Sequence, residues 1–299
     1  LHNEADRQVF QTEVNKRMDV PNGYLKVGVL MLRWQKGLDQ FPKHDQEIDD
    51  LREVFEDLFH YECTIVELHN NKQPMLQLRS AIAKHVEKYD GPNNLEISAT
   101  NDFDLPRGGG KYQPTALWSC ADKQLLDETD GGPESDVLCL MDCCFASNIQ
   151  KCSTSHRRAV QLISASSKDM ATPGPGENSF TTALIVALRH LLKKDGKTGF
   201  PTQKLHQEIL SKRPEPVAML FDRFNRHAKR IKLAPLVKPN REEQHKIEVF
   251  YQEPEKSSLN IRFSLKQSRL SECQIKAFAR ELPVACEKAE IPVRKIDWL

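Results

Sequence analysis

The chain has 299 residues, of which 39% are hydrophobic and 28% charged, enough for one large domain with a small appendage. The charges almost cancel at a formal net charge of +1, and no basic block marks a nucleic-acid surface. No apolar run approaches the roughly 20 residues of a membrane-spanning helix, and the polar start lacks the apolar core of a signal sequence. We therefore expect a soluble, cytoplasmic protein with neither nucleic-acid nor membrane partners.

The eight cysteines are scattered and include no Cys-x-x-Cys pair. A chain of this length and charge does not need a disulfide framework, and a structural zinc site needs ligand pairs at short spacing. The glycine run at 108–110 lacks the spacing of a phosphate-binding loop. We predict no disulfides, no metal site and no cofactor.

The first part of the chain predicts alternating strands and helices. Residues 1–20 are a polar lead-in to a domain that we place at 21–240. The run YLKVGVLML, residues 24–32, is typical of a strand buried on both faces. It is followed by an amphipathic helix, a second strand at 63–68 and a second helix with Leu78 and Ile82 on one face. This order predicts a mostly parallel sheet with crossover helices on both of its faces.

The next segment does not fit this pattern. A third buried strand is due, but the chain continues as DGPNNLEISATNDFDLPRGGGKYQP, in which only LEISA, residues 95–99, resembles a strand. We expect a core strand to be missing here, with LEISA as a partial replacement. A core strand buries several large side chains at about 1.5–3 kcal/mol each, so its loss would approach the whole stability of a domain, about 5–15 kcal/mol.

The remaining elements are predicted in the same way. They are a weak helix at 120–127, strands at 135–142 and 159–166, a helix at 179–194 with Ser179 as its N-cap, a helix at 202–212, and late strands at 215–221 and 231–236. After about residue 240, polar linkers lead into a small β-α-β segment at 245–299. Its strands are expected at 259–265 and 293–298, and its helix opens at Ser271 with Gln274 at capping-box spacing.

The stretch MDCCFAS, residues 141–147, is the candidate site because it follows a buried strand without a break. Functional groups gather at the carboxyl ends of strands in parallel sheets. A thiol here can reach a cleft, where a backbone N–H could stabilise an oxyanion. Most cysteines are inert core residues, as we expect for Cys139, and packing remains the alternative for Cys143 and Cys144.

These residues resemble the nucleophile motif of the caspase-like cysteine peptidases, and most of all that of metacaspases. The family pattern Asp–x–Cys–His–Ser–Gly aligns with residues 142–147, although Phe145 replaces the His and Ala146–Ser147 replaces Ser–Gly. The order of segments around it also resembles fungal caspase-domain proteins over roughly residues 20–299. The resemblance implies that Cys144 is the nucleophile and that Asp142 helps to select basic side chains.

The histidine that activates the thiol in this family lies in a His–Gly motif after the third core strand, and this sequence has no His–Gly pair. A missing exon, omitted residues with closed-up numbering, or a true deletion near 94–96 would each explain this. Among the remaining histidines, His69 is the least implausible substitute because it follows a strand, although a surface role is the alternative.

The resemblance implies a caspase-like three-layer sandwich. It also implies a cysteine endopeptidase that cuts proteins or peptides after basic residues. The missing histidine leaves a second hypothesis open, a non-catalytic caspase-like module that acts through protein contacts. The sequence does not predict the oligomeric state.

Overall fold

The computed structural model describes residues 4–20, 23–36, 43–69, 73–91, 93–101, 116, 118–126, 132–142, 158–167, 172–196, 199–223, 231–236, 241–252 and 256–298. The chain divides into two compact units. One is Gly23–Lys238, and the other joins Leu1–Asn22 to Pro239–Leu299.

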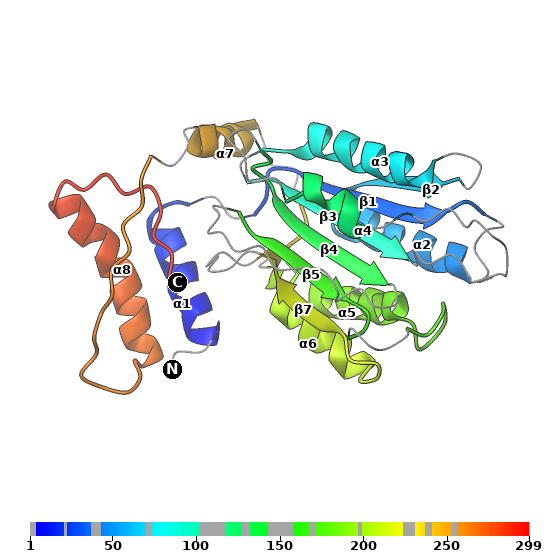
Figure 1. Ribbon diagram of the computed structural model, residues 1–299. Coiled ribbons are helices and arrows are strands. Elements are labelled where there is room, and N and C mark those ends of the chain that lie inside the picture. The colour runs from blue at the N-terminus through cyan, green and yellow to red at the C-terminus, as the bar shows by residue number, and fades with distance from the viewer. Residues whose placement is uncertain are drawn as a thin grey trace. The chain divides into compact units, whose positions relative to one another are not determined.

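The larger unit is built on a six-stranded sheet whose order, within the described residues, is β2-β1-β3-β4-β5-β7 (Figure 1). The first five of these strands run parallel, and β7 pairs antiparallel with β5. The strands are β1 Val27–Trp34, β2 Glu62–Leu68, β3 Leu95–Asn101, β4 Asp136–Asp142, β5 Val160–Ser164 and β7 Met219–Asp222. A separate pair joins β6 Phe200–Pro201 to β8 Lys232–Leu233. The predicted strands of this unit are confirmed, with the two late ones shorter than expected.

Helices cover both faces of the sheet, as predicted. On one face lie α2 His44–Glu53, its π-helical continuation η1 Val54–Leu58, α5 Phe180–Asp195 and α6 Thr202–Lys212. On the other lie α3 Pro74–Tyr89, α4 Trp118–Ala121 and the 3₁₀ turn η2 Asp122–Gln124. Alternate residues of the same strands enter two separate apolar clusters, because successive side chains of a strand point to opposite faces.

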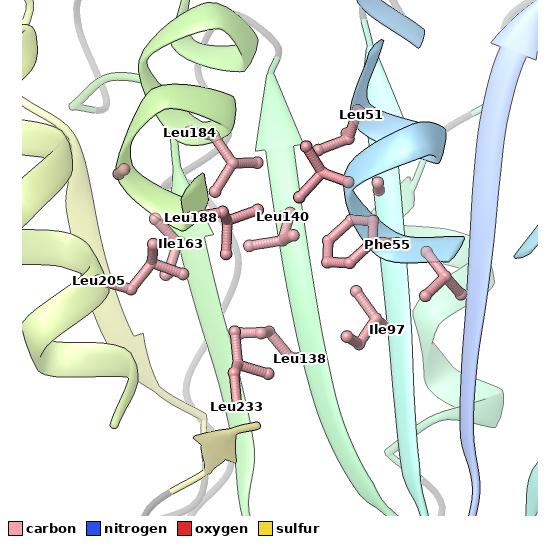
Figure 2. Close-up of a cluster of buried hydrophobic side chains, with 14 of the residues drawn as sticks. Leu51, Phe55, Ile97, Leu138, Leu140, Ile163, Leu184, Leu188, Leu205 and Leu233 are labelled. Carbon is pink, nitrogen blue, oxygen red and sulfur yellow. The ribbon is translucent and has the colours of Figure 1, made fainter. Parts of the chain in front are cut away.

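Among the described residues, the apolar cluster on the α5 face is the larger of these two clusters. Figure 2 shows part of it. Leu138 and Leu140 of β4 contribute to it together with Leu184 and Leu188 of α5, and all four are almost completely buried. The first turn of α5 is closed by Ser179, whose Oγ accepts a hydrogen bond from the Thr182 N–H at 2.9 Å, as its predicted N-cap role requires. Packing and capping together fix the start of α5 beside the end of β4.

Within the described residues a strand occupies the central position of the sheet, so the prediction that a core strand is missing there is wrong. Residues 95–101 form β3, which pairs with β1 from Val27↔Leu95 to Leu32↔Thr100. On its other side β3 pairs with β4 from Leu95↔Asp136 to Asn101↔Asp142. The expected loss of stability therefore does not follow, because LEISATN fills the central position completely.

A polar face of β3 explains why the sequence hid this strand. Leu95 and Ile97 are fully buried in the α5-side cluster, whereas Glu96 and Ser98 are fully buried on the α3 side. The Ser135 hydroxyl donates a hydrogen bond to Glu96 Oε1, while Oε2 has no partner among the described residues. Burial raises the pKa of Glu96 to about 7. A buried strand that carries an acid lacks the continuous apolar run by which such strands are recognised.

The smaller unit joins the two ends of the chain. Helix α1 Glu4–Arg17 packs on α8 Glu272–Lys288 through a cluster centred on Phe10, Val14, Ile275 and Ala279. Salt bridges link Arg269 to Asp6 at 2.9 Å and Arg280 to Glu13 at 2.9 Å. The predicted capping box of α8, Ser271 with Gln274, is formed.

Two predictions for the smaller unit are wrong. Residues 259–265 and 293–298 are not strands, so the expected β-α-β segment is not formed, and a helix, α7 Arg241–Gln252, begins in an expected polar linker. A strand requires a neighbouring strand with which its backbone forms hydrogen bonds. Residues 293–298 instead meet the side chain of Gln11, which donates to the Ile296 carbonyl at 2.9 Å and accepts from the Trp298 N–H at 3.3 Å.

Candidate functional site

The candidate site lies at the carboxyl edge of the sheet, where the five parallel strands end together. Asp142 is the last residue of β4, and its register partner on β3 is Asn101. Cys143 and Cys144 follow directly but lie outside the described residues, as does the rest of 143–157. The site is therefore built from Asp142 outward.

Asp142 is bound to the first turn of α5. Its Oδ2 accepts hydrogen bonds from the Thr181 N–H at 3.1 Å and from the Thr181 hydroxyl at 2.8 Å. Burial raises the pKa of Asp142 to about 6, against the lowering effect of the two bonds from Thr181. The nearby Glu47 carboxylate also raises this pKa, and the Arg213 guanidinium lowers it. At neutral pH the Asp142 carboxyl is therefore mostly ionised, close to a helix N-terminus that favours negative charge.

Glu47 places a second carboxyl group at the same helix end. Its Oε1 accepts three hydrogen bonds, from the Gly176 N–H at 2.8 Å, the Ser179 hydroxyl at 2.6 Å and the Thr182 hydroxyl at 3.0 Å. Its Oε2 is buried and has no hydrogen-bond partner among the described residues. Glu47 thus holds the turn that leads into α5 while keeping one oxygen unsatisfied.

Glu47 belongs to no recognisable sequence motif, although a signal for it exists in the sequence. The buried residues of α2 are His44, Glu47, Ile48 and Leu51, which share one helical face. A charged residue at a core position of an amphipathic helix is rare unless it is paired or functional. Glu47 could therefore have been recognised as an acidic residue on the apolar face of the helix at 44–51.

Arg213 supplies the positive charge near this pair of acids. It is 3% exposed, and burial lowers the pKa of its guanidinium. Its Nε donates to the Asn178 carbonyl at 2.9 Å, and Nη1 donates to the carbonyls of Ala165 at 2.8 Å and Pro216 at 2.9 Å. Arg213 therefore ties together the segments on either side of α5 and α6, and it partly offsets the negative charge of Asp142.

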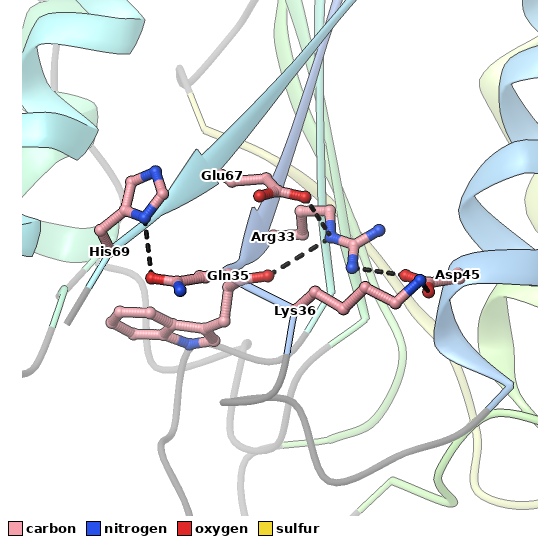
Figure 3. A network of polar contacts seen from close by, with 7 residues as sticks. Arg33, Gln35, Lys36, Asp45, Glu67 and His69 are labelled. Carbon is pink, nitrogen blue, oxygen red and sulfur yellow. Dashed lines mark hydrogen bonds and ion pairs between the residues drawn. The ribbon is translucent and has the colours of Figure 1, made fainter.

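His69 does not lie beside this site. It follows β2, which is separated from β4 by β1 and β3, so three strand spacings of about 4.8 Å place β2 and β4 roughly 14 Å apart. His69 Nδ1 lies 2.7 Å from Gln35 Oε1 (Figure 3). The His69 backbone exchanges two hydrogen bonds with the Gln77 side-chain amide. These contacts give His69 a structural role at the far side of the same edge.

The polar network around Arg33 occupies that far side (Figure 3). Arg33 is 8% exposed and forms ion pairs with Asp45 and, at 3.7 Å, with Glu67. Lys36 Nζ lies 2.7 Å from Asp45. The network links the end of β1 to β2 and to the start of α2, the helix that carries Glu47.

The structure also bears on Cys139, on metal binding and on membrane-spanning helices. Cys139 is buried in mid-strand, which confirms its expected core position, and burial raises the pKa of its thiol to about 12. The described part of the chain contains no group of three His, Cys, Asp or Glu side chains placed to hold a metal ion. Among the helices formed by the described residues, none is long and apolar enough to cross a membrane.

Comparison with known proteins gives structural neighbours only. No protein-family model and no curated protein matches the sequence. The crystal structure of caspase-1 from Spodoptera frugiperda is 13% identical with a TM-score of 0.45, over 68% of this chain and 89% of that one. The structure of drICE is 11% identical with a TM-score of 0.42, over 67% and 89%. The structure of pro-sf-caspase-1 is 13% identical with a TM-score of 0.42, over 72% and 96%.

Proposed function

We propose that the chain carries the site of a caspase-type cysteine peptidase, in which Cys144 is the nucleophile and Asp142 selects a basic side chain. The observation that carries this proposal is the pair of buried carboxyl groups, Asp142 and Glu47, at the start of α5. The pair lies at the edge of the sheet where β4 continues into Cys143 and Cys144.

The acid pair suits a lysine or arginine side chain of a peptide. The Asp142 pKa is raised mainly by burial, and the Glu47 carboxylate raises it further, so a cation that enters between the two groups would relieve an existing electrostatic cost. The unsatisfied Oε2 of Glu47 offers a hydrogen-bond acceptor that no described residue uses. Charge-assisted hydrogen bonds to such carboxylates are about twice as strong as neutral ones.

The chemistry would proceed through the Cys144 thiolate. The sulfur attacks the scissile carbonyl carbon, the C–N bond breaks, the amine leaves with a proton, and water hydrolyses the thioester. A thiol with a pKa of about 8.5 is only a few per cent ionised at neutral pH without an imidazole partner. The sequence has no His–Gly pair, the motif that carries the activating histidine in the family. Without such a partner for Cys144 we expect slow turnover.

The missing His–Gly pair leaves a second candidate function open, a non-catalytic module that binds basic peptides at the acid pair without cleaving them. The two functions predict the same selectivity for a basic side chain. They differ in whether a bound peptide bond is broken.

Alkylation by peptidyl chloromethyl ketones tests the nucleophile. A reagent with arginine next to the reactive group should add once to the folded chain at pH 8, and peptide mapping should place the adduct on Cys144. Cys144→Ala should abolish the adduct, whereas the matched neighbour Cys143→Ala should retain it. An adduct that persists at the same rate after Cys144→Ala would exclude Cys144 as the nucleophile.

Reporter peptides with arginine or lysine separate the two candidate functions. Cleavage that is lost in Cys144→Ala supports the peptidase. Cys144 labelling without any cleavage supports the binding module.

A further inference from the structure

The segment 256–265 of the smaller unit is exposed throughout its length. Its four large apolar residues alternate with polar ones along KSSLNIRFSL, as in an amphipathic strand. Their exposed fractions are 77% for Leu259, 63% for Ile261, 56% for Phe263 and 45% for Leu265. No backbone–backbone hydrogen bond joins this segment to any other described residue. The segment therefore has the pattern of a strand but forms no ladder with the described residues, and its large apolar side chains stay at least 45% exposed.

One anchor fixes the segment to its own unit. The ring of Phe263 packs edge-on against Phe278 of α8, with centroids 5.3 Å apart and an interplanar angle of 83°. Phe278 in turn packs against the α1–α8 cluster through Phe10, at 5.7 Å between ring centroids. The apolar side of the segment is thus turned towards α8 at Phe263, and the backbone edges are available for pairing.

The sequence of the segment is complementary to itself in one antiparallel register. With Ile261 opposite its own copy, Leu259 lies opposite Phe263, Asn260 opposite Arg262, and Ser258 opposite Ser264. Every apolar residue from 259 to 263 then faces an apolar residue, and the amide of Asn260 can accept a hydrogen bond from the guanidinium of Arg262. The like-charged pair in this register, Lys256 opposite Lys266, falls at the open ends of the ribbon.

We propose that residues 257–265 pair with the same residues of a second copy of this chain, forming a two-stranded antiparallel ribbon across a two-fold axis at Ile261. A two-fold axis requires a self-complementary surface, and this register supplies one. Strand addition at unpaired edges is an established mode of protein association. In the ribbon the apolar side chains from 259 to 263 each gain an apolar cross-strand neighbour, and the pairing does not depend on the chemistry of Cys144.

Ile261→Lys tests the ribbon because it places two cations opposite each other on the axis. Sedimentation of the full chain should show a reversible dimer, and the substitution should raise its dissociation constant at least tenfold, equivalent to about 1.4 kcal/mol. The control is Leu76→Lys, at a side chain of α3 that is 56% exposed. This control should sediment as the unmodified chain does. A chain that stays monomeric at all concentrations, or a dimer that Ile261→Lys leaves unchanged, would overturn the proposal.

A crosslink tests the register. In Ile261→Cys the two introduced thiols face each other across the ribbon, within disulfide reach. In the neighbouring variant Arg262→Cys the corresponding Cα atoms would be roughly 8 Å apart, beyond that reach. Mild oxidation should therefore yield an intermolecular disulfide, identified by peptide mapping, in the first variant and not in the second. Equal crosslinking of both variants, or crosslinking of Arg262→Cys alone, would exclude this register.

Discussion

Glu96 makes the stability of the larger unit depend on pH, and Glu96→Gln is the perturbation that reveals it. The carboxyl is fully buried in the central strand β3, with one hydrogen bond from Ser135 and an Oε2 that has no partner among the described residues. Asp90 adds negative charge nearby, and Arg158 adds positive charge. The amide of Gln keeps the acceptor for Ser135 and removes the charge.

The size of the effect follows from the pKa of Glu96. Burial raises this pKa from 4.5 to about 7. At 1.36 kcal/mol per pKa unit this corresponds to about 3 kcal/mol. Below pH 4.5 the Glu96 carboxyl is protonated in both the folded and the unfolded chain, so its pKa shift does not change the free energy of unfolding there. Stability is lost as the pH rises from 4.5 to 7, because only the unfolded chain gains from ionisation there. Above pH 7 the full loss remains.

Urea or guanidinium unfolding at pH 4.5, 6, 7 and 8 measures this difference. Glu96→Gln should match the unmodified chain at pH 4.5 and become more stable than it by about 2–3 kcal/mol at pH 8, somewhat less than the full value because the new NH₂ group is buried. Glu87→Gln, at an exposed position of α3, is the matched control and should show no such trend. A difference between Glu96→Gln and the unmodified chain that is the same at pH 4.5 and pH 8 would refute the reasoning.

Three further predictions follow from particular contacts. Asp122→Ala should cost about 3–5 kcal/mol in urea unfolding, because it breaks a buried ion pair with Arg223 at 3.1 Å, and replacing Arg223 as well should recover part of the loss. Gly28→Ala should cost about 1–3 kcal/mol, because its Cβ would lie 2.4 Å from the Tyr89 ring, and Tyr89→Leu should reduce this cost. Asn101→His, at the register partner of Asp142, should accelerate cleavage of arginine reporter peptides at least tenfold. An unchanged rate would argue against a missing imidazole as the limiting factor.

The sequence predicted those elements whose periodicity was undisturbed. The strands at 24–32 and 135–142 and the helix at 179–194 have continuous apolar patterns, and the structure forms all three. The sequence pattern was misleading at β3 and at residues 259–265. Glu96 interrupts the apolar pattern of β3, and the alternation at 259–265 suggests a strand although no described residue pairs with it.

Of the charged residues at the site, the sequence predicted only Asp142, because Asp142 follows a strand. Asp142 lies at the end of β4, as expected from the apolar run before it. Glu47 and Arg213 come from distant segments, and only the folded chain brings them to the start of α5 beside Asp142. Sequence patterns report local periodicity, whereas this charge cluster depends on tertiary packing.

Selectivity of Cys144 alkylation is the most direct test of the central claim that Asp142 selects a basic side chain. The measurement is the ratio of rates for two chloromethyl ketones that differ only in arginine or leucine, a ratio in which thiol ionisation cancels. We predict a ratio above ten at pH 8 that falls as the pH decreases through about 6, where Asp142 becomes protonated, and a ratio near one in Asp142→Asn. An equal ratio in both proteins at every pH would contradict the claim.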